Sequence, residues 1–527
     1  MPNNVHLLHL LDRLNQIGVS LSREKDLGRL LETILLAAKE LANADAGTLY
    51  LVEDGMLKFE ILRTDSLSIA FGGTSGKAPT FTPIPLCLKD GSPNDDMVVA
   101  CAVINDRTIN IEDAYDIGAY DFSGTRLFDE KTGYRSKSFL TVPMKNHENE
   151  VIGVLQLINA LDESGKIVPF SAASQQLVES LASQAAIALT NRQLIEQLEK
   201  LFESLIKLIN TAIDDKSPYT GGHCERVPEL TMMLAEAVHA AEYGPFKDFH
   251  MSEADRYELK IAGLLHDCGK ITTPVHVVDK ATKLQTLFDR IELLDARFEV
   301  LRRDAEIALL KRQIDESAYW QRVQQLESDQ QFLHQANLGG EFMSEQDVAR
   351  VRHIAAYRWR NAGGEECNFL SDEETDNLCI ARGTLNATER GIINHHIDVT
   401  IQMLEALPWP RHLQHVPEYA GGHHERMDGK GYPRHLTREQ MSVPARVMAI
   451  ADIFEALTAS DRPYKPGKTL TEALTILGRM KQEQHVDPDL FDIFVREKVY
   501  LRYAEHFLDP RQIDAVDPAC IPGYTGE

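Results

Sequence analysis

"GGHHERMDGKGYP", residues 421–433, places two adjacent histidines, His423 and His424, beside a glutamate and just before a rigid turn. Such a pair indicates a metal site, because neutral imidazole is a common metal ligand. We expect Gly421 and Gly422 to let the backbone bend so that both rings turn inward. The turn beyond them is typical of a sharp, fixed loop. The residues expected to support this motif are Glu425, Asp428, Gly429, Gly431 and Pro433.

Residues of metal-binding type also occur in four other parts of the chain. Taken singly, each is explained by a surface position, a hydrogen bond in the core or a helix cap. However, Asp452 follows the apolar run "RVMAIA", where burial of a carboxylate is costly unless it is paired or bound to a cation. A similar apolar face, on a helix expected to begin at Ser252, precedes the "HD" of "LLHDCGKI". The residues in these four places are His223, His266, Asp267, His396 and Asp452.

Five imidazoles and two carboxylates without a thiolate suit borderline divalent metals: iron or manganese, with nickel or zinc as alternatives. The set exceeds what one tetrahedral site requires, which indicates two metals that share a bridging carboxylate. Two metals a few ångströms apart suit the hydrolysis of a phosphate ester. Lys270 and Arg462 lie close in sequence to these residues and are candidates to hold phosphate oxygens.

Three motifs together resemble a known family. "LLHDCGKI" resembles the signature of the HD phosphohydrolases, and "HHERMDGKGYP" and "ADIFEALTASDRPYK" resemble the HD-GYP subgroup, bacterial phosphodiesterases that hydrolyse cyclic di-GMP. The resemblance covers about residues 206–283 and 383–505. It implies an all-α helical bundle in which Asp267 bridges the metals, while Lys270 and Arg462 contact the scissile phosphate. The implied metal ligands are His223, His266, Asp267, His396, His423, His424 and Asp452.

The chain departs from the subgroup in two respects. His396, preferred over His395 because "VTIQML" follows it, comes 129 positions after Asp267, far more than is usual in the family. We expect an inserted helical hairpin at about residues 284–382, a scaffold or dimer contact. Members with a third metal carry a glutamate where this chain has Tyr219 in "SPYTGG", so we expect two metals and linear pGpG as the main product.

Alternatives remain open for the substrate and for Tyr432. The site either hydrolyses cyclic di-GMP, hydrolyses 3′,3′-cyclic GMP-AMP, or binds a cyclic dinucleotide with negligible turnover. Tyr432 either contacts the substrate by stacking on a guanine, packs the turn, or belongs to a surface that docks a GGDEF-domain diguanylate cyclase.

The first segment, residues 1–195, predicts an α+β domain. Strand patterns pair around Asp54 and Gly55 and again around "NHENE". "LFDEKTGYRSKSFLTVPMKNHENEVIGVLQLINA", residues 127–160, resembles GAF domains, sensor modules with an antiparallel sheet and helices. The chain keeps Asn159 of their ligand-associated signature but has Ala160 where lysine is expected. Binding of an unknown ligand and a role in packing or dimerisation are both open.

A long helix is predicted from about Ser171 to Ser217, because no glycine or proline interrupts it. Its central part, residues 175–212, links the sensor to the catalytic domain, residues 206–527. An apolar stripe along it indicates either burial against its own domain or a parallel homodimer seam. The stripe contains Leu177, Leu181, Ala185, Leu194, Leu198, Leu201, Leu205 and Leu208.

Composition limits the class of protein. The 527 residues carry 55 basic and 80 acidic side chains, a net charge of −25, which argues against binding to a nucleic-acid polymer. No run of about 18 apolar residues predicts a membrane span, and no signal peptide is evident. Seven scattered cysteines fit reduced thiols in a cytoplasm.

Overall fold

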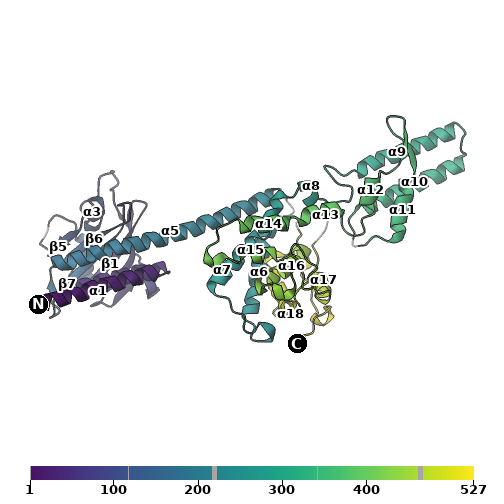
Figure 1. The fold of residues 1–527 in the computed structure, drawn as a ribbon. Coiled ribbons are helices and arrows are strands. Elements are labelled where there is room, and N and C mark those ends of the chain that lie inside the picture. Colours follow the sequence, from purple (N-terminus) through teal and green to yellow (C-terminus); the bar gives the residue numbers. More distant parts are fainter. Residues whose placement is uncertain (1, 117, 217–221, 341, 461–466, 527) are drawn as a thin grey trace. The chain divides into compact units, whose positions relative to one another are not determined.

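The computed structural model describes residues 2–116, 118–216, 222–340, 342–460 and 467–526. They form two compact units, Met1–Phe202 and Glu203–Glu527. The first contains an antiparallel sheet with helices, and the second is predominantly helical, so the expected α+β class is confirmed (Figure 1). None of the described helices is long and apolar enough to cross a membrane.

The sheet of the first unit has the strand order β3-β2-β1-β7-β6-β5, with β4 beside β2 and β8 beside β7. All its pairings are antiparallel. Asp54 and Gly55 both have positive φ, which suits the tight turn between β1 and β2 and confirms that hairpin. The hairpin of β6 and β7 is confirmed as well. The strands are β1 Ala44–Glu53, β2 Met56–Thr64, β3 Ile69–Phe71, β4 Ile84–Pro85, β5 Ile109–Ile111, β6 Phe139–Lys145, β7 Val151–Leu161 and β8 Ile167–Val168.

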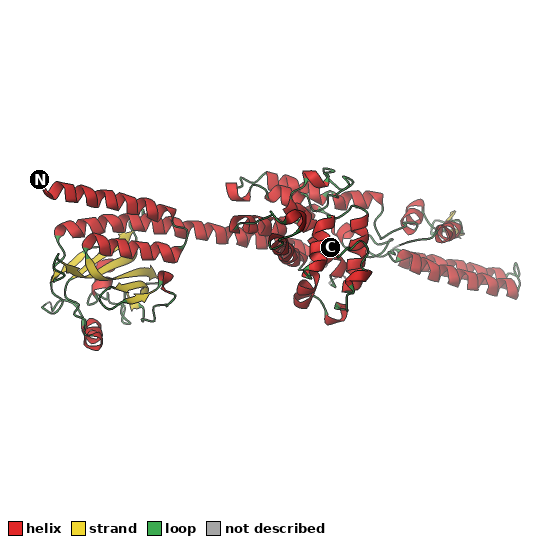
Figure 2. Cartoon of the chain, turned by 90° about the horizontal axis from the view of Figure 1, so that it is seen from below, coloured by secondary structure: helices red, strands yellow, loops and turns green. Residues whose placement is uncertain are grey.

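Helices cover both faces of this sheet. Leu49 and Leu51 of β1 join a core with α1, α2 and the first part of α5. Tyr50, which lies between them, points to the other face and packs near α3, as the alternation of side chains along a strand requires. Figure 2 shows the strands in yellow with helices along them. The helices of this unit are α1 Pro2–Arg23, α2 Leu27–Ala42, α3 Val98–Ile104, α4 Ser123–Thr132 and α5 Ala172–Lys216.

Helix α5 is continuous over 45 residues, which confirms the long helix. Its stripe divides into two parts. Leu177, Leu181 and Ala185 are buried against the sheet domain. The later leucines expose large fractions of their side chains: Leu194 45%, Leu198 64%, Leu201 56%, Leu205 49% and Leu208 65%.

In the second unit, α6 packs against α7 and α16, while α14 packs against α15. Helix α7 begins with a capping box at Ser252, as expected, and ends at Leu265. These contacts bring the ends of several helices together at one place. The helices are α6 His223–His239, α7 Glu253–Leu265, α8 Val275–Val278, α13 Ala387–Asn394, α14 His396–Glu405, α15 Val416–Gly421, α16 Val443–Thr458, α17 Leu470–Gln482, α18 Pro488–Arg496 and α19 Val499–Phe507.

The segment between α8 and α13 has a hydrophobic core of its own, around Leu294, Phe298 and Phe369. Its first two helices pack together as the expected hairpin. A short strand pair, β9 with β10, was not predicted, because three-residue strands of mostly polar residues carry no recognisable alternation. The elements are α9 Ile291–Leu310, α10 Glu316–Asn337, α11 Glu345–Ala355, β9 Arg358–Arg360, β10 Glu366–Asn368 and α12 Asp372–Leu378.

Candidate metal centre

The seven predicted ligands meet in the second unit. They come from the beginnings of α6 and α14, the ends of α7 and α15, and the interior of α16. Two overlapping groups place their ligand atoms within 4.8 Å of one another, and Asp267 belongs to both. The first group is Asp267, His396, His423 and His424, and the second is His223, His266 and Asp267. We call these residues, with Asp452, the metal centre.

The two oxygens of Asp267 face different histidines. Oδ2 lies 3.2 Å from His223 Nε2 and 3.3 Å from His266 Nε2. Oδ1 lies 3.1 Å from His396 Nε2 on the other side. Asp452 Oδ1 lies 3.3 Å from His223 Nε2, so it faces the same group as Oδ2. One carboxylate between two sets of nitrogens is the arrangement that a bridging ligand needs.

The outward ring nitrogens of the histidines are held by the protein. Nδ1 of His266 donates to the carbonyl of Gly263 at 2.7 Å, and Nδ1 of His423 donates to that of Ala420 at 2.6 Å. His396 Nδ1 likewise donates to a carbonyl, at 2.5 Å. A carbonyl only accepts, so the proton of each neutral ring is on Nδ1 and the Nε2 lone pair points to the centre.

His223 is oriented by a carboxylate instead. Its Nδ1 donates to Glu455 Oε2 at 2.5 Å, and Arg226 Nε donates to Glu455 Oε1 at 2.7 Å. Glu455 and Arg226 were not predicted from the sequence as supporting residues. Glu455 does lie three positions after Asp452, a spacing that puts both side chains on one face of α16.

Several inward-facing atoms are buried and have no hydrogen-bond partner. They are Nε2 of His266, His396 and His423, and Oδ1 of Asp267. Unpaired buried polar atoms are costly, and such a cluster calls for an ion or water between them. Imidazole and carboxylate donors fit divalent transition metals, so the described residues form a possible metal site.

Burial and neighbouring charges keep His423, His424 and Asp267 in ligand form. Burial, reinforced by His266, lowers the pKa of His423 to about 4, so the ring is neutral at physiological pH. Burial also holds the pKa of His424 well below its usual value. Burial alone would raise the pKa of Asp267, but Lys270 and the histidines outweigh it and hold the carboxyl ionised. Lys270 Nζ contacts Asp267 Oδ2 directly.

A close backbone contact fixes the "HD" segment against α14. A Cβ on Gly269 would lie 2.0 Å from the carbonyl oxygen of His396, so only glycine fits there. The amide of Gly269 donates to Thr400 Oγ1 at 2.9 Å. This contact joins segments on either side of the insertion and holds Asp267 beside His396. No spacing rule in the sequence indicates Thr400.

The turn after the two histidines is held by the predicted carboxylates. Glu425 is buried and accepts hydrogen bonds from the backbone amides of Arg434, at 2.7 Å, and Leu436, at 2.9 Å. Asp428 accepts from the amide of Lys430 at 3.0 Å and from the Arg426 guanidinium at 3.1 Å.

The motif glycines have different roles. Gly429 has φ +74°, which glycine tolerates best, and a Cβ on Gly431 would lie 2.5 Å from Glu425 Cα. The expected bend at Gly421 and Gly422 was wrong, because Gly421 is helical and Gly422 has φ −94°. Close packing of α15 against its neighbours leaves room for no side chain at either position. A Cβ on Gly421 would lie 2.7 Å from Ile401 Cγ1, and a Cβ on Gly422 would lie 2.9 Å from Ala445 Cβ.

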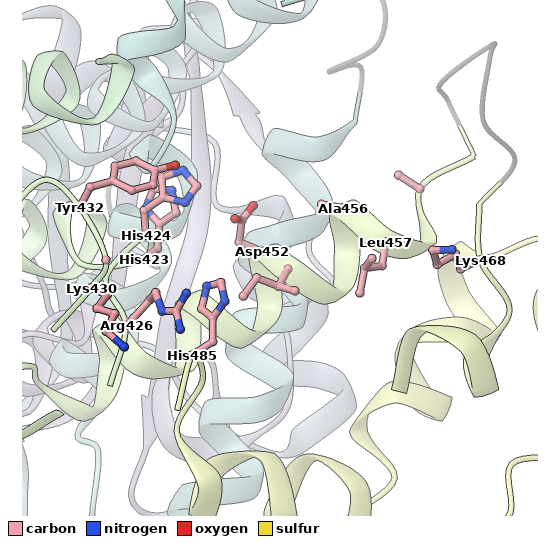
Figure 3. Close-up of a pocket in the computed structure, with 13 residues that line it drawn as sticks. His423, His424, Arg426, Lys430, Tyr432, Asp452, Ala456, Leu457, Lys468 and His485 are labelled. Atoms are coloured by element: carbon pink, nitrogen blue, oxygen red, sulfur yellow. The ribbon is translucent and has the colours of Figure 1, made fainter. Parts of the chain in front are cut away.

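Tyr432 stacks on His424, with ring centroids 4.9 Å apart and planes at 23°, and its bond to Pro433 is cis. Both rings line a cavity of about 490 Å³ that opens beside the metal centre. Figure 3 shows Tyr432 next to His424, with Arg426 and His485 also lining the cavity. The stacking contact therefore places the Tyr432 ring directly beside the metal centre.

His395 and His396 differ in burial. The side chain of His395 is 67% exposed and pairs with Asp398, whereas the side chain of His396 is 4% exposed. Arg462 lies outside the described residues. So do Ser217 and Tyr219, the residues on which the expectation of two metals rested.

Comparisons with known proteins agree with this architecture. The 3′3′-cGAMP-specific phosphodiesterase 1 of Vibrio cholerae serotype O1 is 44% identical over 81 residues, 15% of this chain and 19% of that protein. The 3′3′-cGAMP-specific phosphodiesterase 3 of the same organism is 24% identical over 291 residues. These residues are 55% of this chain and 37% of that protein. A cyclic di-GMP phosphodiesterase of Pseudomonas aeruginosa is 38% identical over 114 residues, which are 22% of this chain and 26% of that protein.

The chain thus spans between 19% and 37% of the length of these relatives. The GAF domain family model matches residues 26–189, and two HD domain models match residues 220–329 and 373–490. The chain therefore carries a GAF domain followed by an HD domain.

Proposed function

We propose that this chain is a metal-dependent phosphodiesterase that hydrolyses cyclic di-GMP to linear pGpG. The observation that carries the proposal is Asp267, whose two buried oxygens face separate sets of imidazole nitrogens. A phosphate diester binds where two cations lie close together, and the cavity lined by His423, His424 and Asp452 has room for a nucleotide. The similarity to cyclic-dinucleotide phosphodiesterases supports the same reading.

Two divalent transition metals, iron or manganese with nickel or zinc as alternatives, would be held by the seven residues of the metal centre. When bound, they would supply positive charge that stabilises the phosphate in the transition state. The protein orients four of the five rings, those of His223, His266, His396 and His423, through the carbonyls and Glu455 behind them, so that Nε2 faces that place. Asp267 would be the bridging ligand.

Two described side chains would position the substrate. Lys270 is mostly buried beside Asp267, so its ammonium group can hold a phosphate oxygen next to the metals. Tyr432 presents a ring that lines the cavity, and we assign it to stacking on a guanine base. Arg462, outside the described residues, would contact the same phosphate.

We further propose that residues 1–195 act as the sensor and residues 206–527 as the phosphodiesterase, joined by the helix over residues 175–212. The five exposed leucines of α5 recur at alternating spacings of four and three, the pattern of a two-stranded coiled coil, so the functional unit would be a homodimer. The unpaired cysteines fit a cytoplasmic protein, and a GGDEF-domain cyclase remains a candidate partner.

The test is metal content and turnover on the full chain, purified under reducing, anaerobic conditions. We expect two transition-metal ions per chain. We also expect conversion of cyclic di-GMP to pGpG, which chromatography measures. His423→Ala should lose both metal and activity, while the matched variant His395→Ala, at an exposed position, should keep them. Full metal occupancy without turnover of any cyclic dinucleotide would instead indicate a binding module.

A second candidate substrate is 3′,3′-cyclic GMP-AMP. The observation in its favour is the 44% identity over 81 residues to a phosphodiesterase specific for that nucleotide. The two substrates differ in one base, so the ratio of kcat/KM values for them on the same preparation decides between the candidates.

A further inference from the structure

The sheet domain contains a second cavity, of about 310 Å³, on the face of the sheet opposite α1, α2 and α5. Its lining comes from β1, β2, β6, β7, α3, α4 and the segments between them. The volume is at the small end of the range of about 300–1,000 Å³ that is typical of ligand pockets. We call it the aromatic cavity.

Aromatic rings form much of its wall. Tyr50 and Phe59 have ring centroids 4.7 Å apart, and Phe59 and Phe81 have centroids 5.1 Å apart, so three rings follow one another along one side. All three line the cavity. A second group of four rings also lines the cavity. The ring centroids of Phe122 and Phe139 are 5.2 Å apart, and those of Phe128 and Tyr134 are 6.5 Å apart.

The buried polar side-chain atoms of the cavity already have hydrogen-bond partners. Tyr50 donates its hydroxyl to Gln156 Oε1 at 3.4 Å, and Gln156 Nε2 donates to Thr141 Oγ1 at 3.2 Å. None of the described residues that line the cavity has a buried side-chain N or O atom without a hydrogen-bond partner. A ligand is therefore not needed to satisfy polar atoms here, in contrast to the metal centre.

Charge restricts the ligand further. Asp121 is the single charged side chain among the described lining residues, and neither lysine nor arginine is among them. Asp121 accepts a hydrogen bond from the amide of Ser123 at 2.8 Å. A phosphate or carboxylate in this cavity would lose water, meet no lysine or arginine among the described lining residues and lie near a carboxylate, which is unfavourable.

We propose that the aromatic cavity binds a small, flat aromatic molecule that carries no negative charge. Such a molecule gains from burial of apolar area and from stacking against the two groups of rings. The same lining excludes anionic cyclic nucleotides from the GAF domain.

The test compares two probes with the same ring system, indole and indole-2-carboxylate, by titration calorimetry on the full chain, with cyclic GMP as a third probe. We expect indole to bind and the carboxylate to bind at least about tenfold more weakly, because its charge is left unpaired. Equal or tighter binding of the carboxylate or of cyclic GMP overturns the proposal. Failure of indole to bind at about millimolar concentration, the weak end of specific affinities, overturns it too.

Ala46→Phe places a ring inside the cavity and should weaken indole binding at least about tenfold. Val19→Phe, the same enlargement at a side chain that is 53% exposed on α1, should leave binding unchanged. If calorimetry shows that Ala46→Phe is unfolded, Phe59→Leu removes one wall ring but keeps an apolar side chain, and should weaken binding about threefold or more. Unchanged binding in the folded variant overturns the proposal.

Discussion

The metal centre and the aromatic cavity are two buried sites in one chain, and they are built in opposite ways. The centre gathers imidazoles and carboxylates from five places in the sequence and leaves four of their atoms without a hydrogen-bond partner. The cavity is lined mainly by aromatic and aliphatic side chains, and none of the buried polar side-chain atoms of its described lining lacks a hydrogen-bond partner. Unpaired polar atoms identify the chemical type of the missing ligand, whereas a paired, apolar lining identifies only its shape and charge.

The strongest test of this contrast is Asp267→Asn. The substitution keeps the shape but removes the charge from the one residue common to both ligand groups, so we expect loss of both metals. Phosphodiesterase activity should fall by roughly three orders of magnitude or more. Metal analysis and chromatography measure these effects, and indole binding to the aromatic cavity should not change. Retention of two metals would contradict the bridging role.

Glu455→Gln is expected to have a smaller effect, because Glu455 orients His223 and is not itself one of the proposed metal ligands. Loss of such a supporting carboxylate typically lowers metal affinity or activity by about 10–100-fold. A competition titration with a chelator measures the affinity. Glu505→Gln, at an exposed position of α19, is the matched control and should leave it unchanged.

Gly269→Ala tests whether the centre depends on backbone packing. Because the added methyl group would meet the carbonyl of His396 and the amide of Thr400, we expect a loss of about 1–3 kcal/mol in the free energy of unfolding. Gly391→Ala, where a Cβ meets no atom within 4 Å, is the control within α13. Denaturant unfolding of both variants checks the difference, and equal stability would contradict the close contact.

The smallest expected effect is in the sheet domain, where Arg63 Nη2 donates to Glu32 Oε1 at 2.5 Å. Burial alone would raise the pKa of Glu32, but the hydrogen bonds from Arg63 and Thr74 outweigh it and lower the pKa. The stabilisation is therefore present above the usual glutamate pKa of about 4.3 and is lost as the pH falls through the lower folded value.

Glu32→Gln should cost about 1 kcal/mol at neutral pH and less in acid. Calorimetry of the variant and the parent between pH 6 and pH 3 measures this difference. Metal content should be unaffected, and a difference in stability that grows in acid would contradict the assignment.

The motifs predicted much of the metal centre, because a costly residue pattern repeats in several places. Adjacent histidines and a carboxylate after an apolar run are hard to explain separately, and the structure brings all seven residues together. The hairpins and the long helix were predictable too, because their signals are local: turn residues, alternation and the absence of helix breakers. Glu455, Arg226 and Thr400 were missed, because a supporting role requires only proximity, which leaves no pattern in the chain.

The aromatic cavity had no signature in the sequence at all. Its rings come from separate strands, helices and loops, and aromatic residues at such positions are usual in any core. By itself, the sequence determined the order of the domains and the chemical class of the metal-type residues, since both depend on residue identity along the chain. The tertiary structure alone decided which nitrogens face Asp267 and where the sheet domain leaves a cavity whose described lining has no lysine or arginine, because those properties depend on packing between distant segments.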